Sequence, residues 1–111
     1  MNILFVASSE SSATRETVKG LLDAALSRGH SVTVFFNDES VRLVKAGGDP
    51  ELVGLLSRGV RLLICRTHAM LSGLTAAGAF ADGVESSSFV ELVELMEESD
   101  RTLFVGGEAV W

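Results

Sequence analysis

The hydrophobic positions of the chain fall into short continuous runs that are separated by amphipathic stretches. Four runs have the length and composition of buried β-strands, at residues 3–7, 32–36, 61–65 and 102–105. They are continuous rather than alternating, which is typical of strands that are covered on both faces, as in a parallel sheet between helix layers. A weaker candidate for a short further strand lies at residues 83–85.

Helical patterns occupy the intervals between these runs. The first helix has an apolar stripe at helical spacing, and Gly29 is its stop signal. Its stripe consists of Val18, Leu21, Leu22 and Ala25. The second helix begins with Asp49 as the N-cap and Pro50 as the first helical residue, and it stops at Gly59.

A third helix is predicted after Ser88, because Ser88 and Glu91 have the spacing of a capping box. Residues 40–46 predict a short helix, and residues 74–87 are rich in Ala, Gly and Ser. Strands that alternate with helices predict right-handed βαβ crossovers and a parallel sheet. We therefore expect residues 1–111 to form a single α/β domain, a three-layer α/β/α sandwich around a mainly parallel sheet of about five strands.

Composition narrows the function classes. The chain has 111 residues, of which 47% are hydrophobic, and its mean hydropathy is +0.35, so it carries enough apolar surface to fold. The net charge is −6 and the nine basic residues are scattered, so we expect no nucleic-acid partner and no membrane anchor. No targeting segment and no run of about 20 apolar residues is visible, which predicts a cytoplasmic protein.

Candidate chemistry gathers at one predicted edge of the sheet. In open α/β sheets, ligands bind at the carboxyl ends of the strands. Cys65 ends the third run, and as the single cysteine it excludes an internal disulfide and a four-cysteine zinc site. Residues 85–87 and 106–108 belong to loops on the same edge. The possible supporting residues on this edge are Ser8, Ser9, Asn37, Arg66, Thr67 and His68.

Two interpretations of Cys65 stay open from the residues alone. Free cysteines are often buried and pack as small hydrophobic side chains. If a helix begins near Thr67, however, Cys65 lies just before its N-terminus, where the helix dipole and free N–H groups favour a thiolate. Arg66 and His68 would add positive charge nearby. His68 is then a base, a proton donor or simply a surface residue.

Several cofactor sites lack their motifs in this chain. There is no G-x-G-x-x-G, no P-loop, and no second cysteine for a C-x-x-C pair. The hydroxyl-rich residues 8–14 weakly imitate a flavin phosphate loop, but N-capping by one serine accounts for them more simply. We expect no cofactor and no metal.

The order of these features resembles the DsrE/DsrF-like sulfur-relay proteins, which include subunits of the Dsr and Tus complexes. The strongest part is the third run ending in Cys65, followed by a short helix and Gly73. Residues 82–85, the helix after Ser88 and the last strand extend the resemblance over nearly the whole chain. The residues between Cys65 and Gly73 are bulkier than the family pattern, which implies a different pocket.

The resemblance implies a DsrEFH-like α/β/α sandwich, assembly into trimers or hexamers, and a persulfide on Cys65 that passes to a partner's cysteine. The favoured function is a sulfur carrier or sulfurtransferase subunit, in a homo-oligomer or with related subunits, served by sulfur donor and acceptor proteins. The alternative is a non-catalytic scaffold or small-ligand-binding module with a structural cysteine. A weaker third reading is a flavodoxin-like nucleotide- or flavin-binding protein, for which the chain has no phosphate loop.

Overall fold

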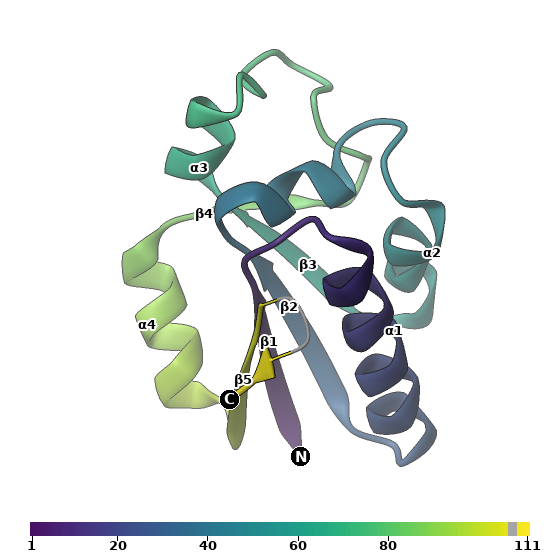
Figure 1. The fold of residues 1–111 in the computed structure, drawn as a ribbon. Coiled ribbons are helices and arrows are strands. Elements are labelled where there is room, and N and C mark those ends of the chain that lie inside the picture. The colour runs from purple at the N-terminus through teal and green to yellow at the C-terminus, as the bar shows by residue number, and fades with distance from the viewer. Residues whose placement is uncertain (107–108) are drawn as a thin grey trace.

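A mainly parallel sheet forms the centre of the computed structural model, which describes residues 1–106 and 109–111 (Figure 1). Its strands are β1 (Asn2–Ala7), β2 (Ser31–Phe36), β3 (Arg61–Cys65), β4 (Glu85–Ser87), β5 (Arg101–Gly106) and β6 (Ala109–Val110). They stand in the order β4-β3-β2-β1-β5-β6, and every neighbouring pair is parallel except β5 and β6. The four strands predicted from the apolar runs are confirmed, and the candidate at residues 83–85 forms β4 slightly later.

The described part of the sheet has one strand more than expected. β6 returns antiparallel to β5, and it pairs Val110 with Val105 and Ala109 with Gly106. A strand of two residues is too short to give a periodic signal in the sequence. The predicted edge loop at residues 106–108 therefore begins inside β5 at Gly106, and residues 107–108 lie outside the described residues.

Helices cover both faces of the sheet. They are α1 (Ser12–Ser27), α2 (Pro50–Val53), α3 (Arg66–Leu71) and α4 (Phe89–Glu98), with the 3-10 helices η1 (Asp38–Val44) and η2 (Gly54–Arg58). Figure 1 shows α1 and α2 on one side of the sheet and α4 on the other, which confirms the three-layer α/β/α sandwich. Among the described helices, none is long and apolar enough to cross a membrane.

The helix ends follow the signals in the sequence. Ser11, Asp49 and Ser88 each accept backbone N–H groups from the first turns of α1, α2 and α4. Gly29 and Gly59 adopt the left-handed backbone, at φ 78° and 82°, just before β2 and β3. That conformation is accessible to glycine at little cost, so each glycine ends its helix and turns the chain into the next strand.

The segment after Asp49 differs from the single helix that was expected. α2 lasts only one turn, and the chain tightens into the 3-10 helix η2 from Gly54 onward. Glycine is a poor helix former, which favours the change at this point. The short helix predicted at residues 40–46 is η1, which begins two residues earlier.

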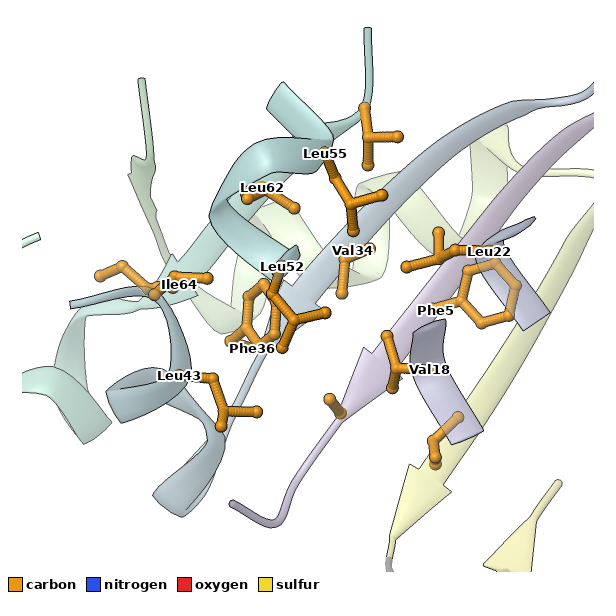
Figure 2. Packing of buried hydrophobic residues seen from close by; sticks show 14 of the residues in the cluster. Phe5, Val18, Leu22, Val34, Phe36, Leu43, Leu52, Leu55, Leu62 and Ile64 are labelled. Atoms are coloured by element: carbon orange, nitrogen blue, oxygen red, sulfur yellow. The ribbon is translucent and has the colours of Figure 1, made fainter. Parts of the chain in front are cut away.

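The two faces of the sheet bury unequal amounts of apolar side chain. Within the described chain, the cluster beneath α1, η1 and α2 has 18 buried residues, whereas the cluster beneath α4 has six. Figure 2 shows the larger cluster, in which Phe5, Val34 and Phe36 of the sheet lie among Leu22 and Leu52 of the helices. The α4 layer is therefore the thin side of the sandwich.

Asp49 ties the cap of α2 to α1. Its carboxylate accepts the backbone N–H of Glu51 at 3.0 Å, and Lys19 Nζ lies 3.0 Å from its second oxygen. Burial by itself would raise the pKa of Asp49, but the Lys19 ammonium and the capped N–H groups outweigh burial and lower the pKa below its ordinary 3.8. The ionised form of Asp49 is therefore the one that stabilises the fold.

Removing this cap should destabilise the protein. Asp49→Ala is expected to lower the free energy of unfolding by about 1 kcal/mol, since it leaves N–H groups of the first turn without an acceptor. Asp49→Asn keeps a capping oxygen and loses only the ion pairs with Lys19 and Arg15, so it should cost less. Urea unfolding of the three proteins at neutral pH measures both effects.

The same comparison has a defined pH dependence. Because the folded pKa of Asp49 is depressed, its stabilisation is complete above the unfolded value and is lost as the pH falls through the folded value. The advantage of wild type over Asp49→Asn should therefore shrink to nothing in acid. If Asp49→Ala were as stable as wild type at neutral pH, the stabilising role of Asp49 as N-cap would be refuted.

Candidate functional site

Cys65 lies where the sequence placed it, at the carboxyl end of β3. It is the last residue of that strand and the N-cap residue of α3. Its side chain is only 1% exposed and belongs to the cluster beneath α4. The other buried members of this cluster are Leu4, Val6, Phe35, Leu63 and Leu92. The thiol therefore lies in an apolar environment, under the thin layer of the sandwich.

Strand alternation explains the direction of the thiol. Successive side chains of a strand point to opposite faces, so Leu63 and Cys65 share one face while Leu62 and Ile64 share the other. The buried clusters have this division, with Leu62 and Ile64 in the larger one. On the outer side of the thiol's face, Leu92 of α4 completes the cover.

A buried hydroxyl fastens α4 next to the cysteine. Ser87 of β4 is the register partner of Cys65, and its Oγ donates a hydrogen bond to Glu91 Oε2 at 2.6 Å. Ser88 caps α4 by accepting the N–H of Glu91, which confirms half of the predicted capping box. The Glu91 carboxylate bonds to Ser87, so the first turn of α4 is tied to the strand beside Cys65.

His68 and Asn37 are two predicted site residues that the fold brings together. His68 Nδ1 accepts the backbone N–H of Asp38 at 2.7 Å and lies within hydrogen-bond distance of the Asn37 side-chain amide. The Asn37 atom that faces Nδ1 is Oδ1, so Nδ1 acts as acceptor in the contact with Asp38 and as donor when it bonds to Asn37, and the tautomer of the ring decides between them. The ring also meets Phe89 edge-on, with centroids 5.7 Å apart. His68 thus links η1 to the first turn of α4.

Arg66 and Thr67 follow Cys65 in α3. Arg66 Nε donates to Ser86 Oγ at 3.2 Å, and its side chain lines a pocket together with Ile64, a residue of the opposite sheet face. Thr67 is exposed. Arg66 therefore serves a different surface from the one that covers the thiol.

Ser8 and Ser9 lie on the same sheet edge but bond to nearby backbone. Ser8 Oγ donates to the carbonyl of Val105 at 3.5 Å, and Ser9 Oγ accepts the N–H of Ser11 at 3.1 Å. These bonds fix the turn from β1 into α1 against β5. The six supporting residues thus divide into the Asn37–His68 pair, the Arg66 surface, the Ser8 and Ser9 turn, and the exposed Thr67.

A hollow of about 190 Å³ lies on the same sheet face as the thiol, between α4 and the β4 edge. Leu63, Ser87 and Glu91 line it, and Ser87 is the register neighbour of Cys65. Cys65 itself does not line the hollow. The Ser87–Glu91 contact was not predicted from the sequence, although a serine directly before the N-cap Ser88 and a glutamate in the first turn of α4 were a usable signal.

Comparison with known proteins shows the family to which the chain belongs. A profile of the DsrE/DsrF-like family matches residues 1–105. The chain belongs to the DsrE/DsrF-like family. This confirms the resemblance seen in the sequence and covers almost the whole chain, Cys65 included. A comparison with curated proteins gave no match.

Two solved structures share the architecture of this family member. YchN from E. coli superimposes with a TM-score of 0.80 at 22% identity, covering 94% of this chain and 98% of YchN. MTH1491, a protein of unknown function from Methanobacterium thermoautotrophicum, gives a TM-score of 0.80 at 14% identity, covering 95% of this chain and 97% of MTH1491. At these identities the likeness concerns the fold alone.

The cover over Cys65 can be tested with a matched pair of cavity variants. Leu92→Ala removes the buried α4 residue over the thiol, and Leu52→Ala removes a buried leucine from the opposite cluster. Each should cost about 2–5 kcal/mol of stability. Leu92→Ala should also speed native-state alkylation of Cys65 by iodoacetamide about tenfold or more, because it favours local opening of α4.

The Leu52→Ala control separates local from global opening. If the thiol reacts through displacement of α4, this control should alkylate at nearly the wild-type rate despite its lower stability. Equal acceleration in both variants would mean that Cys65 reacts only from the unfolded chain, and it would refute α4 as the cover.

Proposed function

We propose that this protein is a sulfur carrier that holds a persulfide on Cys65 and relays its outer sulfur to a partner's cysteine. One observation carries the proposal. The only cysteine of a DsrE/DsrF-like chain stands at the end of β3, on the sheet edge where open α/β folds bind their ligands. The proposed chemistry uses no metal and no organic cofactor.

The relay consists of two thiol–persulfide exchanges. In the first, the Cys65 thiolate attacks the outer sulfur of the donor protein's persulfide, a new S–S bond forms, and the donor's thiolate leaves. In the second, the acceptor's thiolate attacks the outer sulfur on Cys65, and the Cys65 thiolate is released. Each step breaks one S–S bond and makes one, so no external oxidant or reductant is needed.

The surroundings of Cys65 suit the storage of such a group. Leu63 and Leu92 keep water and soluble thiols away from the sulfur, which protects a persulfide from reduction. Transfer then requires the thiol to be uncovered. Displacement of α4 is the smallest movement that achieves this, since six buried residues form the cluster beneath it in the described chain, against 18 on the other face. The donor and acceptor proteins would dock beside this helix.

A second candidate is a non-catalytic oligomeric scaffold or ligand-binding module of the same fold. The burial of Cys65 among leucines favours it, because free cysteines commonly pack as small hydrophobic residues. The two candidates differ in one measurable property, the capacity of the native thiol to gain a sulfur atom.

Persulfide loading tests the proposal directly. The native protein, incubated with cysteine persulfide as donor, should gain the mass of one sulfur atom on the peptide that contains Cys65. Cys65→Ala should gain none, and a small thiol added after the loaded protein is unfolded should remove the gain. A native protein that stays unmodified, while its thiol is modified readily after unfolding, would refute the relay and support the scaffold.

We also propose that the protein works as an oligomer, a trimer or hexamer of itself or an assembly with related subunits. The outer side of α4 presents large apolar side chains to solvent, and contiguous patches of this kind usually mark protein contacts. These residues are Phe89, Val90, Val93 and Met96, and Val90 is 69% exposed.

Light scattering tests the oligomer. The purified protein should have a mass several times its chain mass of 11.8 kDa. The double variant Val90→Glu/Val93→Glu should dissociate it, because each new carboxylate would be buried unpaired at the interface. Glu94→Gln/Glu97→Gln is a control on the same helix that adds no charge. A wild-type monomer would contradict the proposal.

A further inference from the structure

A second pocket lies on the opposite sheet face from the Cys65 thiol. It has a volume of about 310 Å³ and opens between α3, the end of β3 and the segment 74–84. Its inner wall is formed by Ile64, Leu74, Phe80 and Val84, which are part of the larger apolar core or pack against it. Sites for small molecules typically measure about 300–1,000 Å³ and are mostly apolar, so this pocket has the size and lining of a small-ligand site.

Backbone hydrogen bonds hold the outer wall of this pocket. Ala46 N donates to the carbonyl of Ala79 at 2.9 Å, and Ala81 N donates to the carbonyl of Val44 at 3.1 Å. These bonds anchor the segment 74–84 to the end of η1. A preformed pocket avoids the entropy cost of ordering its walls when a ligand binds.

One cation dominates the polar part of this pocket. Arg66 lines it, and its Nε donates to Ser86 Oγ at 3.2 Å, which leaves the terminal guanidinium nitrogens for another acceptor. Across the described residues, no carboxylate forms an ion pair with Arg66, whose side chain is exposed. Arg28 and Arg101 also have none, and Arg28 lines a more open hollow beside α1 that lacks the backbone-bonded outer wall of this pocket. Thr75 adds a hydroxyl to the lining.

We propose that this pocket binds a small amphiphilic anion, with a carboxylate or sulfonate on Arg66 and an apolar body against Ile64, Phe80 and Val84. Guanidinium groups bind such anions through charge-assisted hydrogen bonds, often two at a time. The chain as a whole carries a charge of −6, so most of its surface repels anions. The guanidinium of Arg66 at the edge of this apolar pocket is therefore a local exception, where an anion can bind.

The site is independent of the proposed relay. Ile64 and Arg66 flank Cys65 along the chain, but Ile64 belongs to the cluster on the opposite face from the thiol. A ligand in this pocket therefore lies across the sheet from the sulfur. Its binding should not require the cysteine, and loss of one activity would leave the other testable.

The probe for this site is 4-phenylbutyrate, titrated into the native protein by calorimetry and by amide NMR, alongside the uncharged 4-phenylbutanamide. We expect saturable binding of the acid, with Kd on the order of 1 mM for a ligand of this size. The amide should bind about tenfold more weakly, because it lacks the charge-assisted bond to Arg66. The shifted amides should be those of residues 64–70 and 74–86.

Two arginine variants and one cysteine variant complete the test. Arg66→Gln should weaken binding of the acid about tenfold and leave binding of the amide unchanged. Two control variants should bind the acid as wild type does. One is Arg58→Gln, which changes an exposed arginine of η2 that pairs with Asp23 of α1, and the other is Cys65→Ala. Each of four results would overturn the proposal: no saturable binding of the acid, equal affinity for acid and amide, no effect of Arg66→Gln, or shifts confined to α4.

Discussion

The need to cover a parallel sheet on both faces is the constraint on which this structure depends. Every strand pair from β4 to β5 is parallel, so each connection crosses over one face, and apolar side chains project from both. The two faces of the sheet are covered unequally. α1, α2 and η1 pack on one face, and α4 covers the other with Leu92 as its one buried residue in the described structure and Leu95 partly buried beside it. Part of the apolar surplus in the composition accordingly stays on the outside of α4.

The thinner cover on one face of the sheet determines the surroundings of Cys65. Cys65 faces the thin layer, so a buried thiol is separated from solvent by one helix. Two contacts hold the start of that helix: the Ser87–Glu91 hydrogen bond and the edge of Phe89 against His68. Both contacts lie at the end of the sheet where Cys65 stands, so they hold the end of α4 that lies there. The free energy needed for local opening of this kind is smaller than the free energy of global unfolding.

Local signals made much of the fold predictable. Continuous apolar runs marked the long strands, and Asp49 and Ser88 marked helix starts, because both signals depend on near neighbours in the chain. The alternation of β3 also places Leu63 and Cys65 on one face. Which helices cover that face depends on the direction of each crossover, and the meeting of His68 with Asn37 depends on β2 and β3 being neighbours. The pocket wall at residues 74–84 has no periodicity, so its position comes from long-range backbone bonds.

The central claim is that the native protein exposes Cys65 by moving α4, without unfolding. The most direct measurement is the rate of Cys65 alkylation in the unaltered protein at increasing urea concentrations below the unfolding transition. Local opening exposes little surface, so the rate should be nearly independent of urea at first and should join the steep dependence of global unfolding only near the transition. A rate that follows the steep global dependence at every urea concentration would contradict the account.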